Sequence, residues 1–277
     1  MLFSTTRRLL KMHPIKATDI RTLVNETVLP RYSICTLLTD KALYQQMLES
    51  FVKAGFTPDI TEYLYLDNTI TNAADAYSGI NEFLTMAKGR YIIICHQDIV
   101  LVNDNLAHLE NCIAELNKLD PKWALLGNAG GKSLGSLSLR LTDPHGDNNT
   151  GGFPMKVQSL DENFILVRKD ANLGASSDLD GFHLYGFDLC FMAAMRGYSA
   201  YVVDFHLQHL SPGKISQDFI NCRSRVIGKY QQLFSGRFFQ TTCTSFYLSG
   251  NTMLNSIFNH PPIIKWLEDV YKRFGWS

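Results

Sequence analysis

The stretch Gly89-Arg-Tyr-Ile-Ile-Ile-Cys-His-Gln-Asp-Ile-Val-Leu101 decides the fold expected for this chain. Tyr91 to Cys95 is a continuous apolar run, which is typical of a strand that is buried on both faces of a sheet. The polar residues His96, Gln97 and Asp98 follow directly. Ligands of open α/β sheets bind at the carboxyl ends of the strands, so we expect these three residues at a ligand-binding edge.

Strands and helices alternate on both sides of this stretch. A strand is predicted over Tyr32 to Leu38, and Asp40 can cap the helix that follows. A second strand is predicted over Ile60 to Leu66, ending in Asp67 and Asn68. Repeated alternation of this kind predicts an α/β fold with a mostly parallel sheet flanked by helices. The polar residues at these strand ends are therefore expected at the same edge.

The composition changes after Gly127. Gly, Ser, Asn and Asp dominate as far as Gly152, and the alternating run Leu137 to Leu141 indicates one strand inside a loop-rich insertion. Later elements are predicted as strands at Met155 to Leu160, Phe164 to Val167 and Tyr198 to Val203, and as helices near Leu184 to Arg196 and from beyond Gly213 to about Tyr230.

The segment Gly127-Asn-Ala-Gly-Gly-Lys-Ser133 invites comparison with a phosphate-binding loop. That loop needs four residues between its first glycine and Gly-Lys-Ser, whereas this segment has three. A phosphate-binding loop also opens a helix, whereas Leu137 to Leu141 alternates like a strand. The segment is therefore not interpreted as such a loop. The chain also contains no HExxH or GxGxxG motif, which leaves zincins and dinucleotide oxidoreductases without support.

Charge and cysteine usage restrict the partners and the compartment. The chain has 26 basic and 26 acidic residues, so it lacks the positive field that holds nucleic acid. Its six cysteines form no CxxC pair and are expected to be free thiols, as in a reducing compartment. No apolar stretch reaches the roughly 18 residues that span a bilayer, so we predict a cytoplasmic protein.

Two basic and aromatic segments could touch a membrane surface. Arg7 and Arg8 lie near the start of the chain, and Pro262 to Trp276 interleaves aromatic and basic residues. The alternative for the second segment is an ordinary packed terminal helix. The sequence thus allows a peripheral position at the inner face of a membrane.

Asp98 is the first candidate for metal binding. A carboxylate held at the end of a buried strand suits a hard divalent cation such as Mg²⁺ or Mn²⁺, which can bridge the phosphates of a nucleoside diphosphate. His209 follows a predicted strand, and its imidazole could complete the metal sphere or contact the diphosphate. The alternatives are a capping role for Asp98 and a hydrogen bond under a turn for His209.

Residues 89–101 resemble the strand and DxD segment of family 2-type glycosyltransferases, in a subset with His-Gln-Asp in place of Asp-x-Asp. Tyr65 to Asn68 is similar to the end of that family's second strand. Further along, the chain resembles the family's acceptor-side acidic motif, its glycine-aromatic turn and its late histidine at Phe182 to Cys190, Arg196 to Tyr198 and His206 to Gly213.

The resemblance implies a GT-A fold over residues 31–213, with an N-terminal extension over 1–30 and a mainly helical C-terminal extension over 214–277 packed on the same domain. It also implies a metal-dependent, inverting transfer of a sugar from a nucleotide-sugar donor to a glycan or glycolipid acceptor, with Mn²⁺ or Mg²⁺ as the cofactor. It does not predict the oligomeric state.

The resemblance also assigns roles to individual residues. Asp98 is expected to bind the metal, with His96 in the place of the motif's first aspartate and His209 as a further ligand. Asp188 is expected to be the base that takes the acceptor proton, with Asp180 as the second choice. Asp67 and Asn68, by the resemblance, and Asp40, by its place at a strand end, are expected to contact the donor. The residue pattern alone places Gly130 and Lys132 on a flexible loop near the donor sugar or the acceptor.

Two departures from the family pattern support other functions. His96 replaces an acid of the metal motif, and Gly186 stands where many members carry the first acid of the acceptor-side motif. A catalytically silent GT-A-like module that binds glycan or a partner is therefore an alternative. A nucleotidyltransferase, which would consume a nucleoside triphosphate and release pyrophosphate, is a further one.

Overall fold

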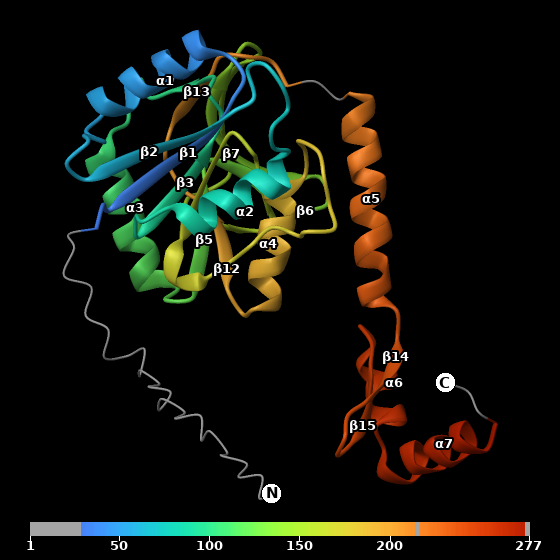
Figure 1. The fold of residues 1–277 in the computed structure, drawn as a ribbon. Coiled ribbons are helices and arrows are strands. Elements are labelled where there is room, and N and C mark those ends of the chain that lie inside the picture. Colours follow the sequence, from blue (N-terminus) through green and yellow to red (C-terminus); the bar gives the residue numbers. More distant parts are fainter. Residues whose placement is uncertain (1–28, 214–215, 275–277) are drawn as a thin grey trace, which may run out of the picture.

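The computed structural model describes residues 29–213 and 216–274 (Figure 1). It confirms the α/β fold: a seven-stranded sheet has the order β2-β1-β3-β11-β5-β12-β9, and β11 and β9 run against the other strands. The strands of this sheet are β1 (Tyr32–Leu38), β2 (Thr61–Asp67), β3 (Tyr91–Cys95), β5 (Trp123–Gly127), β9 (Met155–Val157), β11 (Phe164–Arg168) and β12 (Ser199–Val202). The main helices around it are α1 (Lys41–Lys53), α2 (Ala76–Met86), α3 (Leu106–Leu119) and α4 (Tyr185–Met195).

Strand β3 lies in the interior of the sheet and is buried on both faces. Ile92 and Ile94 belong to the core cluster that includes residues of α2 and α4. Tyr91 and Ile93 belong to the cluster that includes residues of α1 and α3. Alternate side chains of a strand point to opposite faces, so covering both faces requires the uninterrupted apolar run seen in the sequence.

Parallel pairing brings the carboxyl ends of three strands together. β1 pairs with β2 and with β3, so that Leu38 lies opposite Asp67 and Cys35 opposite Ile94. β11 enters antiparallel between β3 and β5, with Phe164 opposite Cys95. The loop before β11 therefore also lies at this edge, where the amide of His96 donates to the carbonyl of Asn163 at 3.0 Å.

The loop-rich insertion expected after Gly127 is instead a second sheet. Its strands follow the order β10-β6-β7-β13-β4, and β8 pairs with β7. Backbone pairing decides this fold, because β8 consists of the polar residues Gly-Asp-Asn-Asn-Thr, which have little intrinsic strand preference. The strands are β4 (Ile99–Val100), β6 (Ala129–Ser133), β7 (Ser136–Asp143), β8 (Gly146–Thr150), β10 (Ser159–Leu160) and β13 (Leu207–His209).

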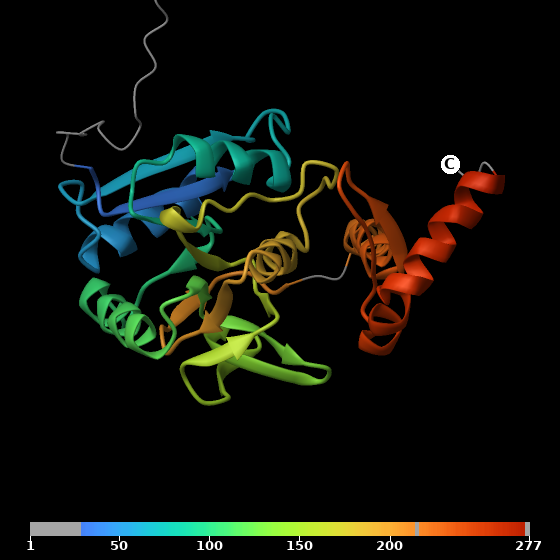
Figure 2. The ribbon, with the colours of Figure 1, turned by 90° about the horizontal axis from the view of Figure 1, so that it is seen from below.

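The C-terminal part begins with α5 (Gln217–Phe234), which packs on α4. The rings of Phe191 and Tyr230 lie 4.3 Å apart between the two helices. The chain then forms β14 (Arg237–Gln240), β15 (Ser245–Leu248), α6 (Thr252–Phe258) and α7 (Pro261–Phe274). Figures 1 and 2 show these last elements together beyond α5, apart from the α/β body. The extension is thus helical with one hairpin, and only α5 among its elements lies along the body.

The predicted domain limits stay a prediction, and the segment 1–28 with Arg7 and Arg8 lies outside the described residues. Within the described ranges, none of the helices combines the length and the apolar composition that crossing a bilayer requires.

Candidate metal and ligand site

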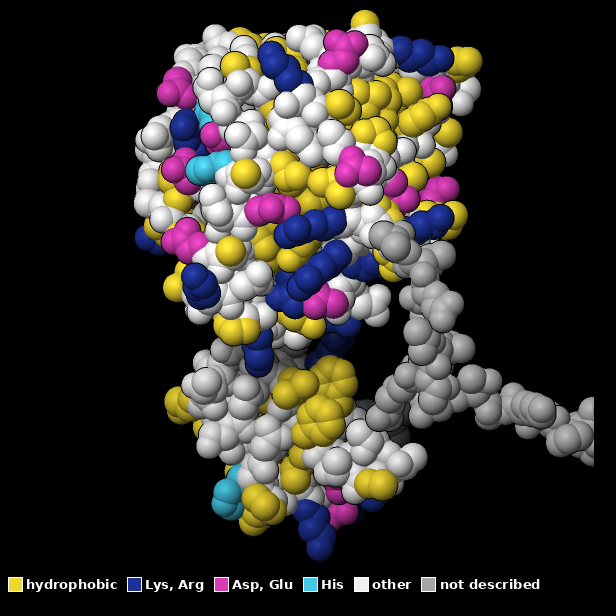
Figure 3. All heavy atoms as spheres, turned by 90° about the vertical axis from the view of Figure 1, so that its left-hand side faces the viewer, with side chains coloured by type: hydrophobic (Ala, Val, Ile, Leu, Met, Phe, Trp, Pro, Cys, Tyr) yellow, Lys and Arg dark blue, Asp and Glu magenta, His cyan; other side chains and the backbone are white. Residues whose placement is uncertain are grey.

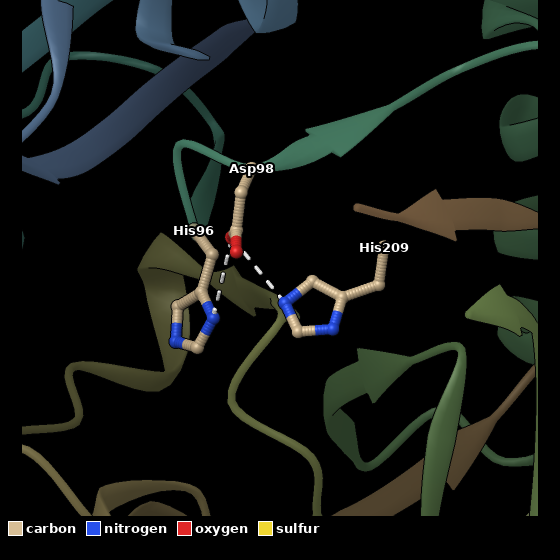
Figure 4. A group of neighbouring side chains, drawn as sticks. All are labelled: His96, Asp98 and His209. Carbon is tan, nitrogen blue, oxygen red and sulfur yellow. Dashed lines mark ion pairs between the residues drawn. The ribbon is translucent and has the colours of Figure 1, made fainter. Parts of the chain in front are cut away.

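His96, Asp98 and His209 converge at the carboxyl end of β3 (Figure 4). One ligand atom from each side chain lies within 4.8 Å of the other two. His96 and Asp98 belong to the turn that joins β3 to β4, whereas His209 ends β13, more than a hundred residues later in the chain. The three residues that the sequence singled out as metal ligands are therefore neighbours in the structure.

The second sheet brings His209 to this position. β13 pairs antiparallel with β4, so that His209 lies opposite Ile99. The amide of Leu210 then donates to the carbonyl of Asp98 at 2.8 Å. Two backbone links thus hold the late histidine beside the turn after β3.

The geometry around Asp98 resembles that of a ligand set. Nε2 of His209 lies 3.3 Å and Nδ1 of His96 lies 3.9 Å from Oδ1 of Asp98. Nε2 of His209 is buried and has no hydrogen-bond partner among the described residues. A buried polar atom without a partner is costly, and a cation between the imidazole and the carboxylate would satisfy both. The residues present therefore fit a divalent metal ion.

Two hydroxyl groups orient these side chains. Ser211 donates to Oδ2 of Asp98. The hydroxyl of Tyr185 lies 3.1 Å from Nε2 of His96 and donates to the carbonyl of Glu162 at 3.1 Å. Nδ1 of His96 is thereby directed at Asp98. Partners of this kind fix the orientation of metal ligands in known metal sites.

The electrostatics of the cluster keep Asp98 ionised and His96 neutral, as cation binding requires, but they favour the protonated form of His209, whose proton a metal ion would have to displace. Burial lowers the pKa of His96, which favours the neutral imidazole. Burial acts to raise the pKa of Asp98, but contact with His209 and the Ser211 hydroxyl outweighs it and holds this pKa well below its ordinary value. For His209, the neighbouring carboxylate raises the pKa although burial acts to lower it.

The chain turns sharply before Tyr185. Leu184 precedes α4 with φ of 64°, in the left-handed region, and no side chain caps the helix at this position. A non-glycine residue pays about 1–2 kcal/mol for this conformation. Strained backbone conformations of this kind are concentrated at functional sites, where they direct a side chain toward the site. Here the turn presents Tyr185 to His96.

A pocket of about 660 Å³ opens beside the cluster. This volume lies in the range of small-molecule sites. Apolar side chains of β1, α2 and β3 form one wall, and residues before and at the start of α4, together with residues that follow β13, form the others. Its lining includes Leu37, Thr39, Ala76, Ile80, Ile94, Phe182, His183 and Pro212 together with the cluster residues.

Gln97 links the ends of two strands at the pocket. Its Oε1 accepts hydrogen bonds from the amides of Thr39 and Asp40, both at 2.8 Å, and its Nε2 donates to the Thr39 hydroxyl. The middle residue of the His-Gln-Asp segment therefore joins β1 to β3. It leaves the imidazole and the carboxylate on either side free for the cluster.

The residues expected at the ends of β1 and β2 lie at the correct edge, but they do not line the pocket. Asp40 caps α1 by accepting from the amides of Ala42 and Leu43. Asp67 accepts from Thr69, and Asn68 is buried with both ends of its amide bound to Ala74. These side chains shape the loops around the pocket.

Gly130 and Lys132 lie on strand β6 and not on the flexible loop that we expected. Neither lines the pocket. A Cβ atom on Gly130 would lie 2.4 Å from the carbonyl oxygen of Ser159, so glycine is required here by the close approach of a neighbouring strand.

The surroundings of Asp188, which the sequence analysis predicts as the acceptor base, favour a structural role. Its side chain is fully buried between α4 and α5. The carboxylate accepts from the amide and hydroxyl of Ser176 and from the hydroxyl of Tyr230. A base needs access to the substrate, so the role that the geometry supports for Asp188 is to join the two helices.

The missing acid at Gly186 has a steric cause. A Cβ atom at this position would lie 2.2 Å from the carbonyl oxygen of Leu160. Asp180 is exposed and pairs with Arg225 at 2.8 Å. It does not line the pocket, but Phe182 and His183, which follow it closely in the chain, do.

Residues to which the sequence analysis assigned no role of their own complete the site. Tyr185, Ser211 and Gln97 hold the cluster and its surroundings, and Glu162 lies at the start of α4. Burial and the neighbouring Asp161 raise the pKa of Glu162 to about 8. The sequence signal for these residues was their proximity to selected ones: Gln97 lies inside the metal segment and Ser211 follows His209 closely.

These features define an α/β protein with a two-histidine, one-carboxylate cluster over a pocket at the carboxyl ends of its strands. No protein-family model matches the chain. A relative named "ATP synthase subunits region ORF 6", from Fuscovulum blasticum, is 39% identical over 213 residues, which cover 74% of this chain and 86% of the relative. The chain belongs to the same family as this protein, whose name states no enzymatic activity.

Solved structures with a similar arrangement have low sequence identity to the chain. A197 from STIV is 13% identical, with 66% of this chain and 86% of that one covered and a TM-score of 0.41. The mannosyltransferase PcManGT from Pyrobaculum calidifontis, in complex with GDP-Man and Mn²⁺, is 14% identical, with 75% and 63% covered and a TM-score of 0.45. GalNAc-T7 with UDP, GalNAc and Mn²⁺ is 9% identical, with 74% and 48% covered and a TM-score of 0.49.

Proposed function

We propose that the chain is a metal-dependent glycosyltransferase of the GT-A type. Its donor is a nucleotide-activated sugar, its acceptor is a glycan or glycolipid, and the transfer inverts the anomeric centre. We further propose that it acts in the cytoplasm, on the synthesis of a polysaccharide or related glycan. The single observation that carries this proposal is the convergence of His96, Asp98 and His209 beside a pocket at the carboxyl end of β3.

The ligand types favour Mn²⁺ over Mg²⁺. Mg²⁺ prefers oxygen ligands in octahedral geometry, whereas imidazole nitrogens suit transition metals. Two of the three side chains in the cluster offer nitrogen, and only Asp98 offers a carboxylate. Replacing the first acid of the motif by His96 therefore changes the metal preference and keeps a site for the cation.

The bound metal would neutralise the negative charge that develops on the leaving diphosphate. The protein's own residues would bind and orient the donor. Ser211 and Tyr185 hold Asp98 and His96 in place, so the ligands are set before the donor enters. The apolar wall of Leu37, Ala76 and Ile80 suits the flat face of a nucleobase.

The acceptor needs a base at the pocket, and we propose Asp180 for this role. Asp188 is buried and occupied by Ser176 and Tyr230, whereas Asp180 is exposed on the segment that leads to Phe182 and His183. Its pair with Arg225 would have to open for the carboxylate to reach the acceptor. The variant Asp180→Asn should then lower turnover with little change in donor affinity.

The proposal is tested first by binding. The full chain is heated with UDP, GDP, CDP or dTDP, each with and without Mn²⁺, because a ligand that binds the native state raises the melting temperature. We expect one nucleotide to stabilise the chain only when Mn²⁺ is present. The variant Asp98→Ala should lose this stabilisation and at least about 100-fold of the transfer rate, since changes beyond the direct ligands alone cost about 10–100-fold.

The metal preference has its own test. His96→Asp restores a second carboxylate beside Asp98, so the ratio of Mn²⁺ to Mg²⁺ affinity should fall, by titration calorimetry, relative to the unaltered chain. His260→Asp, at an exposed position between α6 and α7, is the control that should leave the ratio unchanged. An unaltered chain that binds Mg²⁺ as tightly as Mn²⁺, or binds neither, would contradict the assignment of the cluster.

A second candidate function is a catalytically silent GT-A-like module that binds glycan or a partner enzyme. The observation in its favour is that neither Asp180 nor Asp188 lines the pocket. Turnover of a nucleotide sugar by the isolated chain would exclude it. Metal-dependent nucleotide binding without turnover on any acceptor would favour it over the transferase.

A further inference from the structure

The C-terminal lobe, defined as residues 236–274, buries very little of its own apolar surface. It contains the β14–β15 hairpin, α6 and α7. Tyr247 is its one buried residue among those described. A unit this small cannot form a complete core, so its remaining apolar side chains need another surface to cover them.

Large apolar side chains of the lobe stay exposed. Met253 on α6 is 68% exposed and Trp266 on α7 is 63% exposed. Figure 3 shows apolar side chains gathered on the lobe, below the α/β body. Exposed apolar surface of this kind marks interaction sites in folded proteins. The exposed set in the lobe includes Phe238, Leu248, Met253, Leu254, Ile257 and Trp266.

The lobe is nevertheless internally ordered. The side-chain amide of Asn259 donates to the carbonyl of Tyr247 and accepts from its amide, both at 2.8 Å. Asn255 makes the corresponding pair of bonds with Ser249. Polar side chains thus join α6 to β15 through the backbone. Phe258 of α6 packs on Tyr247, with ring centroids 4.9 Å apart, whereas Met253, Leu254 and Ile257 of the same helix stay exposed.

Helix α7 combines exposed aromatic and basic residues. Lys272 and Arg273 lie seven residues, about two helical turns, after Lys265 and Trp266. The four side chains therefore lie on the same face of α7, and three of them, Lys265, Lys272 and Arg273, are cations. None of these three cations forms an ion pair with a described residue, and Asp269 is the acid on the same face. Glu268 is turned toward β15, where it accepts from Ser245.

The positive charge is local to this end of the chain. Residues 216–274 contain seven Lys or Arg and three Asp or Glu, although the whole chain has a net charge of zero. An anionic lipid surface attracts such basic segments, and Trp is enriched at the interface between lipid and water. A second copy of the chain would bring the same positive charge to the contact.

From the exposed apolar residues and the basic face of α7, we propose that the C-terminal lobe docks on an anionic lipid bilayer. Helix α7 lies in the headgroup region, with Trp266 inserted and Lys265, Lys272 and Arg273 at the phosphates. Docking of the lobe does not involve the residues of the proposed metal site. The docking proposal can therefore be tested separately from the proposed enzymatic activity.

The test uses the full chain and vesicle co-sedimentation. Vesicles of phosphatidylcholine alone are compared with vesicles that contain about 30% phosphatidylglycerol. We expect binding to the anionic vesicles only, and release when NaCl is raised from about 0.1 M to about 1 M. The variant Lys265→Glu/Lys272→Glu/Arg273→Glu should bind about 100-fold more weakly, since each basic residue contributes roughly fivefold.

A matched control separates the lobe from general charge effects. Lys88→Glu/Lys118→Glu/Lys122→Glu makes the same change of charge on exposed positions of the α/β body and should keep vesicle binding. Trp266→Ser should weaken binding without altering the fold, as circular dichroism can verify. Equal binding to both vesicle types, loss of binding in the body variant alone, or a dimer that buries Trp266 and ignores vesicles would overturn the proposal.

Discussion

The α/β body buries most of its large apolar side chains, whereas the C-terminal lobe leaves most of its own exposed. The body packs helices on both faces of its main sheet and buries strands such as β3 and β5 completely. The lobe places polar amides of Asn255 and Asn259 in its interior contacts and exposes Met253 and Trp266. A body that supplies its own stability can hold the side chains of the proposed metal site in fixed positions, whereas a lobe with little core fits the docking role proposed for it.

The largest effect is expected from a core deletion in the body. Leu166 is fully buried at the centre of β11, within the cluster that includes α1 and α3. Leu166→Ala should lower the free energy of unfolding by about 2–5 kcal/mol, because it removes apolar contacts and leaves a cavity. Urea unfolding measures this change, and a loss below about 1 kcal/mol would contradict the close packing described for the body.

The second-largest effect is expected from removing the hydrogen bonds of Asp188, which join α4 of the body to α5 of the extension. Asp188→Ala leaves the hydroxyl and amide of Ser176 and the hydroxyl of Tyr230 without their acceptor. We expect a loss of about 2–3 kcal/mol, since each unsatisfied buried group costs about 1–3 kcal/mol and the helices can partly relax. Asp178→Asn, which alters an exposed pair with Lys229, is the control and should cost no more than about 1 kcal/mol.

The precision of the site can be tested without touching a metal ligand. Ser211→Ala and Tyr185→Phe remove the hydroxyls that orient Asp98 and His96. Each should weaken Mn²⁺ binding by about 10-fold, at the lower end of the range for such supporting contacts. Titration calorimetry measures the affinity, and unaltered binding in both variants would mean that the cluster needs no support.

The smallest effect is expected on the exposed face of the lobe. Met253→Ser should change the free energy of unfolding in water by no more than about 0.5 kcal/mol, since its side chain makes few contacts. The same substitution should weaken binding to anionic vesicles. A destabilisation above 1 kcal/mol would show that this face is packed, and the contrast between body and lobe would then disappear.

Much of the body could be predicted from local patterns. The apolar run of β3, the alternation of strands and helices, and the polar residues at strand ends indicated the sheet and its ligand edge. The candidate metal ligands Asp98 and His209 could also be selected from sequence position, because each comes at the end of a strand. The second sheet could not be predicted, since β8 is polar throughout and is a strand only because β7 pairs with it.

Three carboxylates expected at the site lie outside the lining of the pocket for a common physical reason. Asp40, Asp67 and Asp188 have the residue type and the place in the chain that a ligand site needs, but each carboxylate accepts hydrogen bonds from its own surroundings. Sequence position cannot distinguish a carboxylate that caps a helix from one that faces a pocket. The distinction depends on which donors the folded chain brings within about 3 Å.

The sequence by itself determined the α/β class, the ligand edge after β3, the balanced net charge and the three candidate metal ligands, because these depend on hydrophobic period, charge and residue type. Only the tertiary structure decided that His209 faces Asp98, that Asp188 is buried under α5, and that the C-terminal lobe leaves its apolar side chains exposed. The reason is that orientation and burial are set by contacts between residues far apart in the chain, which no local pattern records.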